Sequence, residues 1–260
     1  MSQASFRIGQ IVPSSNTTME TELPAMFRRR ETLAPERFTF HSSRMRMRHV
    51  SQDELAAMDA ESLRCAVELA DARVDVIGYA CLVAIMAMGR GYHRTSQQRL
   101  AEEAASAGCD ADVVTSAGAL IEGLHAIGAR RVSIVTPYLR PLTDLVVDYI
   151  QSEGIAVIDS IALEIPDNLE VGRRDPMAPL DQLPRLDIAG ADAVVLSACV
   201  QMPSLAAIAP AEQRLGLPVV SAATCTVRSM LLSLGLDPVV PDAGAALSPK
   251  YARQPAQAAN

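Results

Sequence analysis

An internal repeat constrains this chain more than any other feature of its sequence. The segment Arg7–Pro13 has a counterpart at Arg131–Pro137, and each is an apolar run that ends in proline. The segment Val76–Cys81 has a counterpart at Val194–Cys199, and each ends in Ala-Cys. Proline has no N–H to donate to a sheet, so the first pair is expected to form strands that stop there. A chain that repeats two strand ends in this way is expected to fold as two similar halves, divided near Ser116.

The alternation of segments predicts the fold class. Short apolar runs rich in β-branched residues alternate with longer runs of helical period, such as Glu54–Ala72, which is typical of parallel strands joined by helices. The expected strands are Arg7–Val12, Phe38–Ser42, Val74–Tyr79, Ala111–Thr115, Arg131–Val135, Ile155–Ser160, Ala193–Ser197 and Pro218–Ser221. We predict an α/β fold of two similar parallel-sheet domains, related by pseudo-two-fold symmetry, with the active site at their interface.

The domain limits follow from the repeat. The first domain, residues 1–116, carries Cys81, and the second domain, residues 117–242, carries Cys199. The C-terminal helices of the second domain are free to pack back onto the first. From about residue 243 the sequence is rich in Ala, Pro and Gln and has little periodicity, so residues 243–260 are expected to form a flexible tail.

The repeat also places two cysteines at equivalent strand ends. Ligands in parallel sheets bind beyond the carboxyl ends of the strands, and duplicated α/β halves are expected to face each other across a cleft. Cys81 precedes a run that predicts a helix, and Cys199 repeats that setting. A helix N-terminus lowers the pKa of a thiol and favours the nucleophilic thiolate. We therefore predict that Cys81 and Cys199 are catalytic and face each other across the ligand.

The remaining cysteines predict no metal site. Cys65, Cys109 and Cys225 lack repeated counterparts and are expected to be inert core residues. The five cysteines do not have the paired spacing of a zinc site, and no histidine has a second ligand at metal spacing. No glycine-rich phosphate loop follows any predicted strand. We therefore expect neither a metal nor a cofactor.

Three polar residues follow other strands near the predicted site. Asn16 lies in a Pro-Ser-Ser-Asn loop, which either presents its amide and backbone N–H groups to an anion or only caps a helix. Tyr138 follows Thr-Pro, where it either donates a hydrogen bond or only covers the core. Asn168 is either a ligand-binding residue or a turn residue. The residues alone leave each of these pairs of interpretations open.

The stretch Arg44–Arg48 alternates arginine with methionine and is followed by His49. One interpretation is a mobile flap that attracts dicarboxylates. The interpretation we favour is a solvated edge with Met45 and Met47 tucked inward. The stretch is too short to follow a nucleic-acid backbone, and the net charge of −7 is spread along the chain, so no nucleic-acid partner is expected.

Composition predicts a soluble protein. No apolar run approaches the roughly 18 residues that cross a bilayer, so no membrane partner is expected. The first residues lack the basic region and apolar core of a signal peptide. The expected location is the cytoplasm, where the five cysteines would stay free thiols.

Four motifs carry a resemblance to a known family. Those at Pro13–Asn16, Tyr79–Cys81, Thr136–Tyr138 and Ser197–Cys199 resemble the maleate cis-trans isomerases, members of the aspartate/glutamate racemase superfamily. The resemblance covers residues 7–238. It implies a homodimer with a metal-free site buried between two α/β domains. The related arylmalonate decarboxylases lack the first of the two cysteines, whereas this chain has both.

The resemblance implies roles for individual residues. The carboxylates of a small dicarboxylate substrate are expected to be held by Asn16, Tyr138 and Asn168, helped by the backbone of Leu82, Val83, Val200 and Gln201. The implied reaction is a cofactor-independent isomerisation of maleate to fumarate. In it, the Cys81 thiolate adds to the double bond while Cys199 protonates the other carbon. The central bond of the resulting succinyl adduct is single and free to rotate.

Other functions fit the same pair of thiols. In a cofactor-independent amino-acid or hydantoin racemase, the two cysteines would remove and return a proton with no covalent adduct. An arylmalonate-type decarboxylase and a non-catalytic two-lobed binding protein are further alternatives. The facing thiols argue against the binding protein, and the presence of the first cysteine argues against the decarboxylase. A succinyl adduct on Cys81 would separate the isomerase from the racemase.

Overall fold

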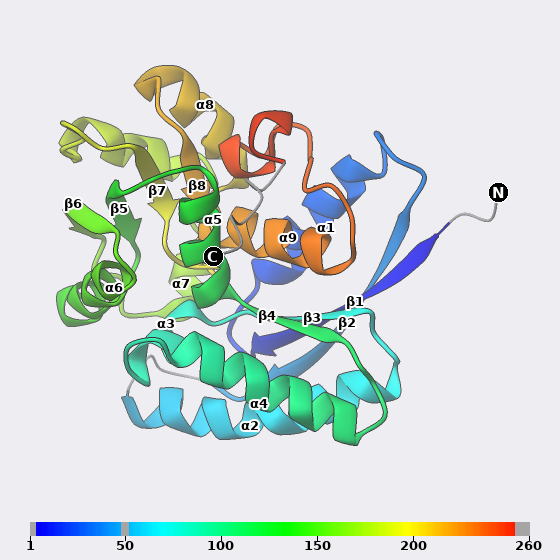
Figure 1. Cartoon of the computed structure of the whole chain (residues 1–260). Helices are drawn as coiled ribbons and strands as arrows, with labels where there is room; N and C mark the ends of the chain where they lie inside the picture. Colours follow the sequence, from blue (N-terminus) through cyan, green and yellow to red (C-terminus); the bar gives the residue numbers. More distant parts are fainter. Residues whose placement is uncertain (1–3, 48–51, 253–260) are drawn as a thin grey trace, which may run out of the picture.

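The chain folds into two four-stranded parallel sheets that lie side by side (Figure 1). This computed structural model describes residues 4–47 and 52–252. The strands of the first sheet are β1 (Ser5–Pro13), β2 (Arg37–Met45), β3 (Val76–Tyr79) and β4 (Asp112–Thr115), in the order β2-β1-β3-β4. Those of the second are β5 (Arg131–Thr136), β6 (Ala156–Ala162), β7 (Ala193–Ser197) and β8 (Val219–Ser221), in the order β6-β5-β7-β8.

Helices connect the strands, as parallel pairing requires. The α-helices are α1 (Met19–Arg30), α2 (Gln52–Asp71), α3 (Leu82–Ala87), α4 (Tyr92–Ser106), α5 (Ser116–Ala126), α6 (Arg140–Ser152), α7 (Asn168–Gly172), α8 (Leu205–Leu215) and α9 (Ala222–Ser233). Three 3₁₀ helices are η1 (Ala178–Arg185), η2 (Ala245–Leu247) and η3 (Pro249–Tyr251). No helix within the described ranges is long and apolar enough to cross a membrane.

The two sheets have the same strand order, which confirms the predicted fold class. Strands β1 to β4 occupy the positions that β5 to β8 occupy in the second sheet. All the pairs are parallel, and each strand expected from the sequence overlaps an observed one. The central strands β3 and β7 are buried along their whole length, as expected for parallel strands covered on both faces.

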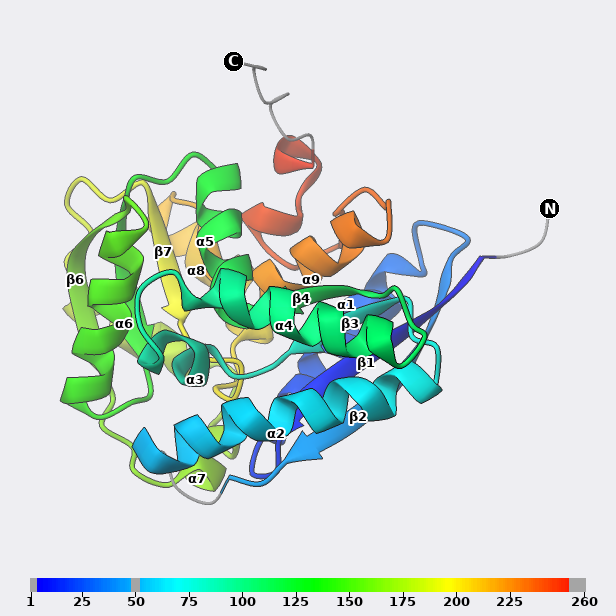
Figure 2. The same cartoon turned by 60° about the horizontal axis from the view of Figure 1, so that its bottom comes forward.

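The C-terminal helix α9 follows the second sheet but packs against the first. Figure 1 and Figure 2 show α9 and α1 on one face of the first sheet, with α2 and α4 on the other. Gly78 of β3 makes room for α9, because a Cβ there would lie 3.2 Å from the Met230 methyl group. The domain limits expected at residues 116 and 242 stay a prediction, since α9 joins the two halves.

The expected flexible tail is wrong for its first part. Ala243, Ala246 and Leu247 are buried. The Val240 N–H donates to the Leu247 carbonyl at 2.9 Å, so this segment is held to the preceding loop. A sequence of small residues without periodicity packs here as irregular structure, which composition alone does not separate from disorder. Residues 253–260 of the expected tail lie outside the described residues.

The arginine-methionine stretch forms the solvated edge that we favoured, as far as it is described. Arg44 and Arg46 are exposed, whereas Met45 and Met47 are buried. Arg44 forms an ion pair with Glu20 of α1 at 2.9 Å. Its role there is structural, because it also donates to backbone carbonyls of the loop after β1. Arg48 and His49 lie outside the described residues.

Candidate active site

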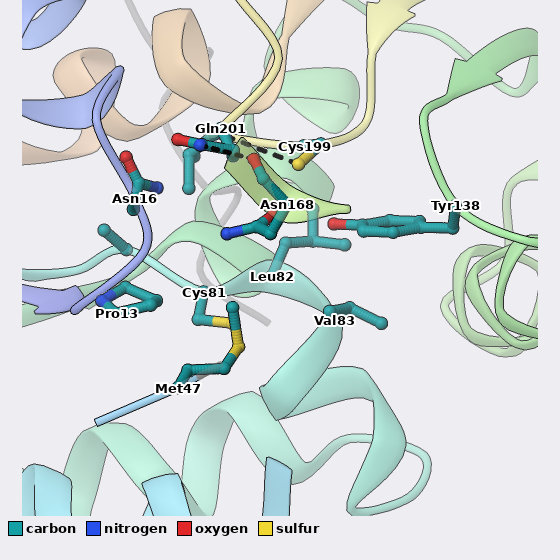
Figure 3. Close-up of a pocket in the computed structure, with 12 residues that line it drawn as sticks. Pro13, Asn16, Met47, Cys81, Leu82, Val83, Tyr138, Asn168, Cys199 and Gln201 are labelled. Carbon is teal, nitrogen blue, oxygen red and sulfur yellow. Dashed lines mark hydrogen bonds between the residues drawn. The ribbon is translucent and has the colours of Figure 1, made fainter. Parts of the chain in front are cut away.

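A small cavity of about 20 Å³ lies where strand ends of the two sheets meet (Figure 3). It is lined by Pro13, Asn16, Met47, Ala80, Cys81, Leu82, Val83, Tyr138, Asn168, Cys199, Val200 and Gln201. This set contains every residue expected at the site from the sequence. Pro13, Met47 and Ala80 are additional, and Met47 was expected only to be tucked inward. A cavity of this size holds about one water molecule, so a bound ligand would be in close contact with all the walls.

Cys81 stands between β3 and the first residue of α3. It is buried, and burial raises the pKa of its thiol to about 12. The backbone N–H of Ala84 in α3 counters this by hydrogen bonding, while the nearby Cys199 adds to the rise. The expectation of a lowered pKa for Cys81 is therefore wrong. The helix N-terminus contributes in the expected direction, but desolvation of the thiolate outweighs it.

Cys199 follows β7 and lies in a loop rather than directly before a helix, since α8 begins only at Leu205. Burial raises the pKa of its thiol, and hydrogen bonds from Tyr138 and from the backbone N–H groups of Gln201 and Met202 lower it. The Gln201 N–H lies 3.3 Å from the Cys199 sulfur. The helical setting predicted for Cys199 is thus wrong, but three other donors take its place. They favour a thiolate at Cys199 more than the surroundings of Cys81 do.

Asn16 both caps a helix and faces the cavity. Its Oδ1 accepts hydrogen bonds from the N–H groups of Thr18 and Met19 at the start of α1, each at 2.9 Å. This fixes the amide so that its nitrogen lies on the cavity side (Figure 3). The capping interpretation is therefore correct, while binding of an anion by the amide N–H groups, which this cap does not use, stays a prediction.

Two residues of the second half point polar groups at the same space. The Tyr138 ring is buried, and burial raises its pKa well above the ordinary value, with the two cysteines adding to the rise. Its hydroxyl is therefore a neutral donor. Asn168 begins α7, and its Nδ2 donates to the Ser15 hydroxyl at 2.8 Å. Figure 3 shows both side chains directed into the cavity from the side of the second sheet.

Gln201 joins the loops around the cavity through its side chain. It accepts a hydrogen bond from the Thr17 N–H at 2.8 Å and donates to the carbonyls of Ser15 at 3.1 Å and Asn168 at 2.8 Å. A Cβ on Gly172 would come under 3.0 Å from this amide, so the end of α7 is packed tightly on it. The sequence analysis gave a binding role only to the backbone of Gln201. The side-chain role was missed because no feature of the neighbouring sequence indicates a hydrogen bond to Thr17, 184 residues away.

The other three cysteines lie away from the cavity. Cys65, Cys109 and Cys225 are buried free thiols. Burial raises the pKa of Cys225 to about 12, as it does for Cys81, so what separates the two thiols is that Cys225 does not line the cavity. Within residues 4–47 and 52–252, no cluster of His, Cys, Asp or Glu side chains is arranged to hold a metal ion.

The chemistry available is that of two thiols among neutral donors. Among the described residues that line the cavity, none is Asp, Glu, Lys, Arg or His. An anion there would be held by amide, hydroxyl and backbone N–H groups. Two buried thiols, of which Cys199 is near enough to raise the pKa of Cys81, can add to a carbon or move a proton.

Comparisons with known proteins agree with this geometry. The family model for arylmalonate decarboxylase matches residues 8–247. The chain is 62% identical over 246 residues to a maleate isomerase of Pseudomonas putida, which covers 95% of this chain and 98% of the relative. The chain belongs to the maleate isomerase family. A maleate isomerase of Geobacillus stearothermophilus is 60% identical over 247 residues, with 95% and 98% covered.

Solved structures of maleate isomerases share the fold throughout. A variant from Pseudomonas putida, solved with maleate, matches with a TM-score of 0.94 and 57% identity, covering 96% of this chain and 100% of the other. A Nocardia farcinica variant with a covalently bound succinylcysteine intermediate matches with a TM-score of 0.90 and 48% identity, covering 94% and 98%. The membership expected from the four sequence motifs is thereby confirmed.

Proposed function

We propose that this maleate isomerase converts maleate to fumarate with Cys81 as nucleophile and Cys199 as proton donor and acceptor. The observation that carries the proposal is the pair of buried thiols in one small cavity whose described lining residues carry no charge. The succinylcysteine in the Nocardia farcinica relative supports a covalent route. A racemase would use the same pair without forming a carbon-sulfur bond.

The double bond is opened by addition. The Cys81 sulfur forms a bond to one alkene carbon, and the π electrons move towards the carboxylate on the other carbon as an enediolate. Cys199 then gives its proton to that second carbon. The succinyl adduct on Cys81 rotates about its central single bond. Cys199 takes the proton back, the carbon-sulfur bond breaks, and fumarate leaves with both thiols as they began.

One proton shared by the two thiols is sufficient for this cycle. The donors around Cys199 favour the anion there, whereas Cys81 with its pKa of about 12 holds its proton more tightly. Transfer of the proton from Cys81 to Cys199 creates the nucleophile and the acid in one step. The addition therefore begins from a pair that carries a single negative charge.

Neutral donors bind the two carboxylates. The Asn16 amide serves from the first sheet, while Tyr138 and Asn168 serve from the second, helped by backbone N–H groups of Leu82, Val83, Val200 and Gln201. These donors are already fixed by the fold, so they stabilise the enediolate as it forms. Burial of these donors strengthens each of the hydrogen bonds.

The test is an intact-mass measurement on the Cys199→Ala variant after incubation with maleate. The variant keeps the Cys81 thiol, which must now exchange its protons with water, so addition should be slow; it also lacks the base that removes the proton from the adduct, so the adduct should not go on to fumarate. One succinyl unit per subunit should accumulate on Cys81, located by proteolysis, with little fumarate formed. An unmodified variant would show that Cys199 is needed for addition itself and would favour the racemase-like use of the pair.

Assembly and location are part of the proposal. The family resemblance implies a homodimer, which light scattering would detect as about twice the 27.7 kDa of the chain. Five unpaired cysteines favour the reducing cytoplasm. The catalytic cycle above needs neither a metal nor a cofactor.

A further inference from the structure

The side chain of Gln201 forms hydrogen bonds to both groups of carboxylate donors, which are also joined by the bond from Asn168 Nδ2 to the Ser15 hydroxyl. Asn16 belongs to the loop after β1, and Asn168 begins α7 on the other side of the cavity. The Gln201 amide donates to the carbonyls of Ser15, next to Asn16, and of Asn168 itself. Its oxygen accepts from the Thr17 N–H. One side chain thus contacts the backbone on both sides of the space that a dicarboxylate would fill.

Further contacts make this link rigid. The Thr18 hydroxyl donates to the Gln201 carbonyl at 2.7 Å, so the backbone of Gln201 is also held by the loop after β1. Gly172, at the end of α7, leaves no room for the amide to move, because even a Cβ there would overlap with it. Gln201 is 3% exposed. Its amide oxygen and both hydrogens have partners, so its orientation is determined by the hydrogen bonds.

We propose that Gln201 is a positioning residue that sets the spacing between the two carboxylate-binding groups. This inference rests on the proposed function of the cavity. The residue acts through Asn16 and Asn168, whose separation decides which dicarboxylates fit. Without the Gln201 bonds, the Asn168–Ser15 hydrogen bond would be left to hold the two loops, their separation would vary more, and binding would become both weaker and less selective for length.

The Gln201→Glu variant tests this with little change in shape. The carboxylate still accepts from Thr17 but has no hydrogen to give to the carbonyls of Ser15 and Asn168. Calorimetry would measure the Kd of malonate and of succinate, two dicarboxylates that differ by one methylene and have no double bond to react. We expect the parent to prefer one of them several-fold. In the variant both Kd values should rise, by about tenfold or more, and their ratio should approach one.

A second variant, Gly172→Ala, disturbs the Gln201 amide without changing Gln201 itself. Gly172→Ala leaves Gln201 in place but puts a methyl group where its amide lies, so it should lose selectivity in the same way. The matched control is Gln151→Glu, the same substitution at an exposed position of α6, which should change neither Kd. Thermal unfolding of each variant would confirm that it is folded.

The outcomes separate positioning from general stability. If the Kd values of malonate and succinate rise by the same factor, so that their ratio is unchanged, Gln201 has only a structural role and the proposal is overturned. Unchanged Kd values for both ligands would overturn it as well. Lowering the pH should restore part of the affinity of the Gln201→Glu variant, because the protonated carboxyl regains one donor. None of these measurements needs turnover, so failure of the Cys81 mechanism would be seen separately in the mass experiment above.

Discussion

The carboxylate of Glu22 accepts a hydrogen bond from the Leu205 N–H at 2.7 Å, so a side chain of α1 caps α8 of the other half. The Ser204 N–H donates to the same oxygen, also at 2.7 Å. Both donors belong to the first turn of α8, where backbone N–H groups have no partner within the helix. The contact therefore satisfies two buried donors and holds the two halves of the cavity together.

Removing this cap is expected to destabilise the fold. Glu22→Ala would leave both N–H groups unpaired and should lower the free energy of unfolding by about 1 to 3 kcal/mol. Glu22→Gln keeps an acceptor oxygen and should lose less. The control is Glu20→Ala on the same helix, whose ion pair with Arg44 is partly exposed and should contribute under about 1 kcal/mol. Denaturant unfolding would measure all three, and equal loss for Glu22→Ala and Glu20→Ala would show that the cap adds nothing.

Much of the fold could be predicted because the internal repeat can be recognised from short, contiguous sequence motifs. Apolar β-branched runs mark the strands, and prolines mark where two of them end. The equivalent ends of one strand in each sheet then bring Cys81 and Cys199 to one cavity. The family motifs then indicated Asn16, Tyr138 and Asn168. All of these features lie within a few residues of the position they describe.

The features that could not be predicted depend on distant parts of the chain. The side-chain role of Gln201 comes from partners in another half. The raised pKa of Cys81 comes from how completely the surrounding segments exclude water, which overrides the local effect of the helix. The folded segment around Leu247 is buried by other elements, although its own sequence resembles that of a disordered tail.

A second prediction separates the two functions of Asn16. Asn16→Asp keeps the oxygen that caps α1 but replaces the amide nitrogen with a second oxygen that repels a dicarboxylate. We expect near-normal thermal stability and a rise of KM for maleate by at least about tenfold, since a buried donor to a charged group is replaced by a like charge. Asn16→Ala should lose stability as well. Steady-state kinetics with maleate would check this, and an unchanged KM for Asn16→Asp would place the carboxylates elsewhere.

A third prediction concerns the choice of thiols. Cys81→Ala should abolish fumarate formation, because alanine cannot add to the double bond and the bond order then never drops. Cys65→Ala, Cys109→Ala and Cys225→Ala should retain nearly full turnover and lose only the modest stability of a small core change. Proton NMR of the vinylic hydrogens distinguishes maleate from fumarate and would measure each rate. Substantial turnover by Cys81→Ala would defeat the covalent mechanism.

The last prediction is the pH dependence of the reaction. The pair must lose one proton to become reactive, and burial raises the pKa of both thiols above their ordinary value of 9.0. Below that pH both thiols are therefore mostly neutral, and kcat/KM for maleate should keep rising as the pH increases from about 7 to 9. Tyr138→Phe removes a hydrogen bond that lowers the pKa of Cys199, so its profile should shift to higher pH. Circular dichroism at each pH would show that the protein stays folded. A profile that is flat between pH 7 and 9, or one that Tyr138→Phe shifts to lower pH, would mean that another group supplies the reactive charge.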